Sequence, residues 1–302
     1  MLAGVFPVLA TPFHPDGSPD EEGLRAIARY VISAGADGVV FPGVASEFES
    51  LTPQERDTLS DIVASEARGR AAFVVGGSSP DPAVSEAVAR RASGQGAAAI
   101  MVMAPKTITE QDAVIAFFAR VAQAAGAVPI MLQNAPPPAG SGLPVAVVAA
   151  VARAVPQIAY VKEEAMPSGA RITQMLASAP PTLRGVFGGA GGRYITDELA
   201  RGAVGTMPAC ELAEIHVALM KAHARGDRAE VRHLFNRMLP LLNFQAVFRM
   251  AMTKETLRRR GIIAHAGKRA AGPELDAGDQ RELGELLAEM SDLLDPPVIA
   301  NA

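Results

Sequence analysis

With 302 residues, 49% of them hydrophobic and 20% charged, the chain has the composition of a globular protein with a large core. Its net charge of −4 argues against a nucleic-acid partner, and its single cysteine excludes both a disulfide framework and a cysteine-rich zinc site. No apolar run approaches the ~20 residues that a membrane span requires.

The start of the chain, MLAGVFPV, is strand-like and lacks the basic residues and long apolar stretch of a signal peptide. The five histidines never fall in a metal-binding spacing such as His-Glu-x-x-His. The one dense basic cluster, 258–260, ends a helical stretch, where it complements the helix dipole better than it binds a polyanion. We expect a soluble cytoplasmic protein without a metal, a nucleic-acid partner or a membrane partner.

Eight short apolar runs follow one another through the first 207 residues, and each predicts a strand. They are continuous and rich in Val, Ile, Ala and Met, as buried parallel strands are. The runs are Val5–Ala10, Gly38–Phe41, Ala72–Val75, Ala98–Met103, Pro129–Gln133, Ile158–Lys162, Leu183–Phe187 and Val204–Met207.

Amphipathic segments that predict helices separate these strands. The clearest are Asp20–Ala34, Pro53–Ala67, Pro82–Ser93 and Glu110–Ala124. The second begins with Thr52-Pro53-Gln54-Glu55, an N-cap followed by proline and an acid. Strict alternation of strand and helix predicts a parallel sheet, and eight units favour closure into a (β/α)8 TIM barrel. No G-x-G-x-x-G follows the first strand, which argues against an open dinucleotide-binding sheet.

Beyond residue 210 the strand pattern disappears and a helical pattern replaces it. The predicted helices are Glu211–Ala224, Arg228–Leu242, Phe244–Arg260 and Ala277–Leu293, and the stretch 265–273 predicts a loop. No low-complexity linker separates them from the barrel. We therefore expect residues 1–226 to form the barrel and residues 227–302 to form a helical extension packed on it.

Lys162 has the most informative position, because it is the only lysine that ends an apolar strand. Barrel enzymes carry their active sites at the carboxyl ends of the strands, and alternation turns Tyr160 and Lys162 toward the same inner face. Burial lowers the pKa of an amine, so a neutral nucleophile becomes available to attack a ketone and form an iminium. The alternative is a structural lysine paired with Glu163, Glu164 or Glu47.

The ends of other strands supply further polar groups. The turn 43–47 offers backbone N–H groups and the Ser46 hydroxyl to a substrate carboxylate, or is a plain turn in which Ser46 caps a helix. Gln133 and Asn134 can orient a substrate or satisfy buried backbone groups. Gly188-Gly189 permits close approach of the backbone, which a turn also requires.

Four motifs occur in order: Gly4–Phe13, Gly43–Glu47 with Leu51–Arg56 after it, Tyr160–Glu163, and Gly202–Gly205. Together they resemble the dihydrodipicolinate synthase/N-acetylneuraminate lyase superfamily, over essentially the whole chain. The resemblance implies that Lys162 is a Schiff-base lysine, that no cofactor is needed, and that the protein is a homo-oligomer, a tetramer or a dimer.

Several positions depart from the synthase pattern. Gln133 replaces the proton-relaying tyrosine, and glutamine cannot titrate. Val44-Ala45 replaces the paired threonines, and Lys106-Thr107 replaces the tyrosines after the fourth strand. The synthase's arginine falls at Pro138. The chain is therefore more similar to the 2-keto-3-deoxy sugar-acid dehydratases, such as L-2-keto-3-deoxyarabonate dehydratase, than to enzymes of lysine biosynthesis.

The resemblance implies a Schiff-base lyase that acts on a small-molecule 2-oxo acid. A Lys162 iminium would form at C2, a C3 proton would be removed, and the C4 hydroxyl would leave, with water or Glu47 as proton carrier and Gln133 bonded to the substrate. An aldolase, a 4-hydroxy-tetrahydrodipicolinate synthase-like enzyme and a non-catalytic 2-oxo-acid-binding paralogue remain open. The residues predicted to bind substrate are Ala45, Ser46, Asn134, Gly188, Gly189 and Thr206.

Overall fold

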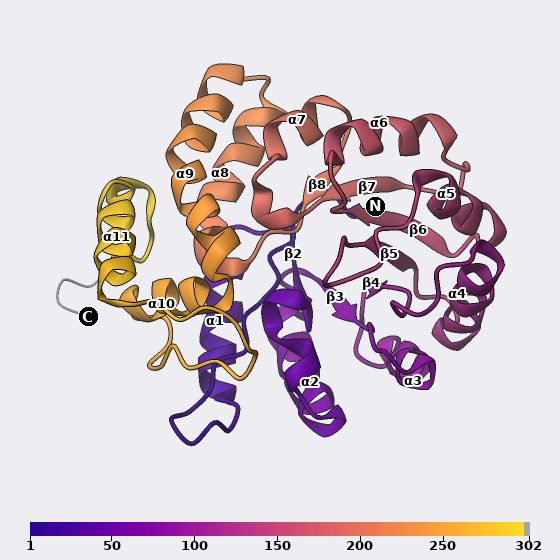
Figure 1. Cartoon of the computed structure of the whole chain (residues 1–302), viewed down its shortest axis with the longest axis horizontal. Coiled ribbons are helices and arrows are strands. Elements are labelled where there is room, and N and C mark those ends of the chain that lie inside the picture. Colours follow the sequence, from indigo (N-terminus) through magenta and orange to yellow (C-terminus); the bar gives the residue numbers. More distant parts are fainter. Residues whose placement is uncertain (299–302) are drawn as a thin grey trace.

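Eight parallel strands in the order β1-β8-β7-β6-β5-β4-β3-β2 form the centre of the molecule (Figure 1). The structure, a computed structural model, describes residues 1–298. A parallel bridge between Val8 and Val40 joins the first and second strands and closes the ring. The predicted (β/α)8 TIM barrel is therefore confirmed. The strands are Gly4–Val5 (β1), Gly38–Phe41 (β2), Ala72–Gly76 (β3), Ala99–Val102 (β4), Ile130–Asn134 (β5), Ile158–Glu163 (β6), Gly185–Gly188 (β7) and Gly205–Thr206 (β8).

The first strand is shorter than the predicted Val5–Ala10. Its regular pairing with β8 ends at Val5, and Val8 then makes only isolated bridges, to Val40 and Ala209. Proline at position 7 has no N–H group and cannot donate to a strand ladder, which explains the early end.

Eight helices surround the strands, and the four predicted between residues 20 and 124 are found within one or two residues of their expected bounds. The predicted capping of the second is also present, since the Glu55 N–H donates to Thr52 Oγ1 at 3.2 Å and the Thr52 N–H to Glu55 Oε2 at 2.8 Å. The helices are Glu21–Ser33 (α1), Pro53–Ala67 (α2), Pro82–Ala92 (α3), Gln111–Ala125 (α4), Val145–Ala154 (α5), Ser168–Ser178 (α6), Ile195–Ala200 (α7) and Ala213–Ala224 (α8).

Large apolar side chains fill the inside of the barrel. Phe187 lies between Phe6 and Tyr160, with ring centroids 5.5 Å and 6.1 Å away in edge-to-face arrangements. The Tyr160 hydroxyl accepts a hydrogen bond from the Leu2 N–H at 2.8 Å, near the amino-terminal end of the barrel. Lys162, two residues further along β6, lies on the same face but at the opposite end, as the alternation predicted.

Three helices follow the barrel: Arg228–Phe248 (α9), Met250–Arg259 (α10) and Ala277–Ala288 (α11). The predicted helix boundary at residue 243 is wrong, because α9 continues past Leu242 and ends at Phe248. Arg249 has a φ of 48°, in the left-handed region, which interrupts the helical backbone and starts α10 in a new direction. The last predicted helix is also shorter, since α11 ends at Ala288.

The C-terminal helices lie against the carboxyl end of the barrel. α9 contacts α8, α7 and the turn at Ala190–Gly192, while α10 contacts the turn at Cys210–Leu212 (Figure 1). This packing brings residues 245–250 to the barrel mouth. The division at residue 226 stays a prediction, and residues 299–302 of the predicted extension lie outside the described residues.

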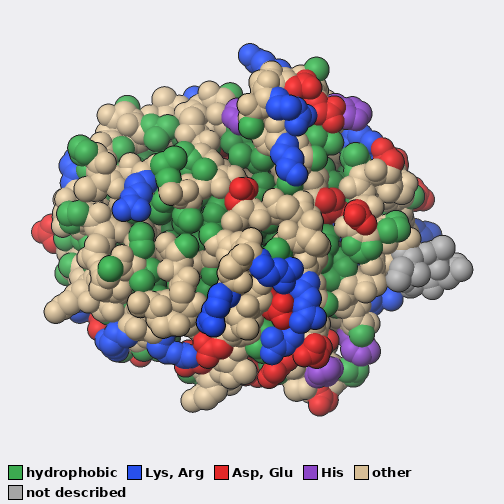
Figure 2. Space-filling view, turned by 180° about the vertical axis from the view of Figure 1, so that it is seen from behind, with side chains coloured by type: hydrophobic (Ala, Val, Ile, Leu, Met, Phe, Trp, Pro, Cys, Tyr) green, Lys and Arg blue, Asp and Glu red, His purple; other side chains and the backbone are tan. Residues whose placement is uncertain are grey.

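The basic cluster 258–260 takes part in contacts within the protein. Arg258 and Arg259 both bond to the Glu255 carboxylate, and Arg260 is buried against Glu214. On the face shown in Figure 2, basic and acidic side chains lie among one another. Of the helices in residues 1–298, none combines the length and the apolar character needed to cross a membrane.

Candidate active site

Lys162 lies near the carboxyl end of β6 with its side chain only 5% exposed. Its Nζ is 3.2 Å from Oε1 of Glu164, two residues further along the chain. Of the three acids that the sequence offers as partners, Glu164 is the one in contact. Strand register places Gln133 of β5 on one side of Lys162 and Phe187 of β7 on the other.

Glu164 is held from three sides. Gln133 Nε2 donates to its Oε2 at 2.7 Å, the Ala190 N–H donates to its Oε1 at 3.2 Å, and Lys162 supplies a positive charge. Burial acts to raise the pKa of Glu164, but the Lys162 charge and these hydrogen bonds outweigh it and keep that pKa below its usual value. Glu164 is therefore an ionised carboxylate in contact with a buried amine.

Gly189 makes room for this carboxylate. A Cβ at position 189 would lie only 2.5 Å from the Glu164 side chain, which a real side chain never does. Glycine at this position lets Glu164 fold back toward Lys162, and the predicted role of Gly189 in substrate binding stays a prediction.

A cavity of about 130 Å³ opens at the Lys162 amine. Most of its apolar lining comes from the segments that follow the strands, and the C-terminal helices add Ala246 and Met250 as well as polar side chains. Arg193 Nη1 donates to Gln245 Oε1 at 3.2 Å in this lining. The polar side chains that line the cavity are Lys162, Glu164, Arg193, Gln245 and Arg249.

The 3₁₀ turn at Val44–Ser46 forms another wall of this cavity. The first N–H groups of such a turn have no acceptor inside it. Those of Val44 and Ala45 can therefore donate hydrogen bonds to a substrate carboxylate. The Ser46 hydroxyl is already engaged, since it donates to the Leu9 carbonyl at 2.5 Å and accepts from the Gly43 N–H at 2.9 Å. The turn thus offers its backbone to a ligand while the Ser46 side chain holds its shape.

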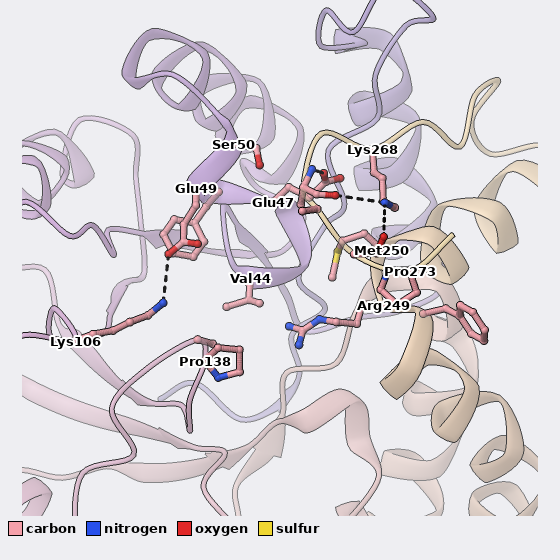
Figure 3. Close-up of a pocket in the computed structure, with 16 residues that line it drawn as sticks. Val44, Glu47, Glu49, Ser50, Lys106, Pro138, Arg249, Met250, Lys268 and Pro273 are labelled. Carbon is pink, nitrogen blue, oxygen red and sulfur yellow. Dashed lines mark hydrogen bonds and ion pairs between the residues drawn. The ribbon is translucent and has the colours of Figure 1, made fainter. Parts of the chain in front are cut away.

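Glu47 follows the same turn but its carboxylate is bound elsewhere. It forms a buried ion pair with Lys254 of α10, and its Oε2 accepts hydrogen bonds from the N–H groups of Arg269 at 2.8 Å and Ala270 at 2.6 Å. Burial lowers the pKa of Lys254 to about 8, although Glu47 opposes the shift. Glu47 lines a neighbouring cavity of about 510 Å³ (Figure 3), and its predicted catalytic role stays a prediction.

Three other predicted residues lie close to the site without lining the small cavity. The Asn134 side chain bonds to the backbone of Leu143 in both directions, at 3.0 Å and 2.8 Å, and so fixes the segment after β5. At Gly188 the Glu198 carboxylate occupies the space that a Cβ would need. Thr206 is fully buried. The predicted role of these residues in substrate binding stays a prediction.

Sequence analysis missed Arg193, Gln245 and Arg249, and considered Glu164 only as a structural partner. Arg193 alone carried a usable signal, because it follows the glycine-rich end of a strand. Gln245 lies on α9 and Arg249 at the junction after it, both more than 80 residues beyond Lys162, so only tertiary packing brings them to the barrel mouth.

The chain also matches a known protein family. Residues 1–290 match the Dihydrodipicolinate synthetase family. The chain belongs to this family. It is 29% identical over 285 residues to the L-2-keto-3-deoxyarabonate dehydratase of Azospirillum brasilense, which covers 93% of the chain and 92% of that relative.

Other members give the same assignment. The 4-hydroxy-tetrahydrodipicolinate synthase of Exiguobacterium sp. is 32% identical over 248 residues, which cover 80% of the chain and 82% of the relative. The crystal structure of dihydrodipicolinate synthase from Rhodopseudomonas palustris matches with a TM-score of 0.89 and 25% identity, over 95% of this chain and 97% of that one. The resemblance inferred from the four motifs is confirmed, and the chain is a lyase of the dihydrodipicolinate synthetase family.

Proposed function

We propose that the chain is a Schiff-base lyase that dehydrates a 2-keto-3-deoxy sugar acid, with Lys162 as the nucleophile. The observation that carries the proposal is the contact between the buried Lys162 amine and the Glu164 carboxylate, 3.2 Å apart in the wall of a cavity. Similarity to the Azospirillum dehydratase over 93% of the chain supports dehydration as the reaction.

Formation of the Schiff base needs a neutral amine and a fixed ketone. The N–H groups of Val44 and Ala45 bind the C1 carboxylate of the substrate, so that the C2 ketone faces Lys162. Glu164 accepts a proton from the Lys162 ammonium. The neutral amine attacks C2, and its proton passes to the ketone oxygen to give the carbinolamine. Glu164 then returns its proton to the carbinolamine hydroxyl, which leaves as water, so the iminium forms beside an ionised Glu164.

Elimination then requires a group that takes a proton from C3 and gives it to the leaving oxygen. Glu164 removes the C3 proton, and the electron pair of the C–H bond moves to the iminium to give a neutral enamine. Loss of the positive charge on the Lys162 nitrogen removes an influence that lowers the Glu164 pKa, which favours this transfer. The C4–O bond then breaks, Glu164 protonates the departing hydroxyl as water, and hydrolysis of the resulting iminium releases the 2-oxo acid and Lys162.

Gln133 supports Glu164 in this sequence. Its Nε2 holds Glu164 Oε2 at 2.7 Å and so leaves Oε1 facing Lys162. Because an amide does not titrate, Gln133 positions the carboxylate and the substrate without carrying a proton. Glu164 carries the proton, because it lines the reactive cavity, whereas the Glu47 carboxylate is bonded to Lys254.

Borohydride trapping tests the proposal. The protein is incubated separately with pyruvate and with 2-keto-3-deoxy sugar acids, reduced, and mapped by mass spectrometry, with Lys162→Ala beside the matched surface variant Lys221→Ala. We expect an adduct on Lys162 that only Lys162→Ala abolishes, and formation of a dehydrated 2-oxo acid. Release of pyruvate and an aldehyde would identify an aldolase instead, and no adduct with any 2-oxo acid would overturn the Schiff-base mechanism.

We also infer that the protein is a homo-oligomer, a tetramer or a dimer. Exposed apolar side chains support this, namely Leu176 on α6, Tyr194 before α7 and Val247 on α9, whose exposed fractions are 39%, 44% and 58%. Sedimentation equilibrium tests the inference, since a single species of 31.4 kDa at micromolar concentration would contradict it.

A further inference from the structure

Arg249 lines both the cavity at Lys162 and the larger cavity beside it. The two cavities, of about 130 Å³ and 510 Å³, also share Val44 and Met250, so they adjoin at this point. In Figure 3 the Arg249 side chain extends from the C-terminal helices toward Val44 and Pro138. A ligand attached to Lys162 that is longer than pyruvate therefore extends toward Arg249.

The backbone fixes the position of Arg249. It lies between α9 and α10 with a φ of 48°, its N–H donates to the Gln245 carbonyl at 2.8 Å, and its carbonyl accepts from the Thr253 N–H at 3.0 Å. These bonds end one helix and begin the next. The side chain is thus presented to the cavities by a rigid junction rather than by a mobile loop.

The acids in the walls of the two cavities already face other cations. Glu164 contacts Lys162, Glu47 contacts Lys254, and Glu49 lies 3.9 Å from Lys106.

Arg249 forms no ion pair with the acids of these walls, while Arg193 donates to Gln245 and lies within reach of the Glu164 charge. Burial lowers the pKa of Arg193, and the positive charge of Arg249 acts in the same direction, while Tyr194 and Glu164 oppose the shift. The two guanidinium groups are therefore close enough to repel each other.

The charge of the inner cavity therefore indicates the charge of its ligand. Lys162, Arg193 and Arg249 carry three positive charges and Glu164 one negative charge, which leaves an excess of two. Conversion of the Lys162 ammonium to an iminium keeps this balance. A 2-oxo acid with one carboxylate neutralises half of the excess, whereas a dicarboxylate neutralises all of it.

We propose that the substrate is a 2-oxo acid that ends in a second carboxylate, and that Arg249, assisted by Arg193, binds this terminal group. The inference rests on the proposed function, because the substrate is attached to Lys162. A guanidinium binds a carboxylate through two parallel hydrogen bonds, which gives both affinity and orientation. A terminal phosphate fits the charge less well, since it would bring a third negative charge.

Matched pairs of ligands test the inference on the full chain. 2-Oxoglutarate is compared with 2-oxopentanoate, and 2-oxoadipate with 2-oxohexanoate, so that each pair differs only in the terminal carboxylate. The concentration that gives half-maximal borohydride adduct on Lys162 is measured by intact-protein mass spectrometry. We expect at least one diacid to half-saturate at a concentration about ten- to a hundredfold below that of its monoacid partner.

Variants assign this preference to its residue. Arg249→Gln is expected to reduce the preference to about threefold or less, while the surface control Arg281→Gln keeps both the preference and the pyruvate adduct. Raising the salt concentration is expected to weaken the preference in the wild-type protein.

Two results separate the proposals. If pyruvate forms the adduct but each diacid and its monoacid half-saturate alike, or if Arg249→Gln keeps the full preference, the second-carboxylate inference is overturned and the Schiff base stands. If pyruvate forms no adduct, both fail. The comparison of each diacid with its monoacid uses the wild-type protein alone, so it tests the inference even if Arg249→Gln does not fold.

Discussion

The proposed reaction requires Glu164 to be ionised beside Lys162 at one step and to carry a proton at another. The contacts with Lys162, Gln133 and Ala190 keep its pKa low and so favour the ionised form. Protonation of Glu164 becomes easier when the Lys162 nitrogen loses its charge as the enamine forms. The same carboxylate can thus serve as base and then as acid within one turnover.

Replacing Glu164 by Gln removes this proton carrier while keeping the size of the side chain. We expect kcat to fall by about 10²- to 10⁴-fold, the usual contribution of a general acid–base group. The pyruvate adduct on Lys162 should still form, because Lys162 itself is unchanged in this variant. Steady-state turnover and borohydride trapping on the same samples check both expectations.

The surface variant Glu282→Gln serves as the control for that substitution. Turnover of Glu164→Gln at the wild-type rate would show that the proton carrier is elsewhere, with water or Glu47 as the remaining candidates.

Glu198 lies behind the site, where its carboxylate accepts a hydrogen bond from the Ser168 hydroxyl at 2.6 Å. Burial raises the pKa of Glu198 to about 7 from 4.5, although the Ser168 bond opposes the shift. Between these two values the folded protein binds more protons than the unfolded chain. The contribution of Glu198 to stability is therefore fully present below pH 4.5 and is lost as the pH rises through 7.

Glu198→Gln mimics the protonated side chain and should remove this dependence on pH. Relative to the wild type, we expect the free energy of unfolding of the variant to rise by up to about 3 kcal/mol between pH 4.5 and pH 8. Urea denaturation at both pH values measures it, with Glu285→Gln as an exposed control. An equal difference between variant and wild type at the two pH values would refute the expectation.

The segment 265–273 is held on the barrel by α10 and by the turn after β2. Glu47 is central to this attachment, since it pairs with Lys254 and accepts two backbone N–H groups of the segment. The Arg269 side chain adds a bond to Glu55 at 2.7 Å, at the start of α2. This loop therefore has defined contacts, and the Lys254–Glu47 and Arg269–Glu55 ion pairs join the helical extension to the barrel.

Breaking the buried ion pair from one side should be costly. Lys254→Met leaves the Glu47 carboxylate buried without its partner, and we expect it to lower the free energy of unfolding by about 3–5 kcal/mol. The exposed control Lys221→Met should change it by less than about 0.5 kcal/mol. The double variant Glu47→Gln/Lys254→Met should recover part of the loss, and chemical denaturation measures all three.

The double variant also tests Glu47 as a catalytic group. If it folds and turns over substrate, Glu47 acts by holding the loop; if it folds and forms the Lys162 adduct without turnover, the predicted role of Glu47 in proton transfer gains support.

Much of the architecture could be predicted from the sequence because it depends on local patterns. Apolar runs of buried strands, proline and threonine at the start of α2, and the place of Lys162 at a strand end are all local signals. The end of α9 was mispredicted because the helix is interrupted by the backbone conformation of Arg249, a residue type that gives no local signal for a break.

The site itself was only half predictable, since it is assembled from distant parts of the chain. Strand alternation was enough to place Lys162, and Gln133 followed from its motif. The contacts of Glu164 depend on the backbone after β7 passing close enough to bond its carboxylate. The contributions of Gln245 and Arg249 depend on how α9 packs against the barrel, which a single sequence does not encode in any local pattern.

The residues that would carry out the reaction and those that would recognise the far end of the substrate come from different parts of the chain. Lys162, Gln133 and Glu164, which would carry out the reaction, come from strand ends, whereas Gln245 and Arg249 come from α9 and from the junction between α9 and α10, which follow the barrel. A mutation at the junction can therefore change which acid is accepted without altering the reactive pair. In evolutionary terms, a lineage with this arrangement can acquire a new substrate through a few substitutions between residues 245 and 250 while inheriting its chemistry unchanged.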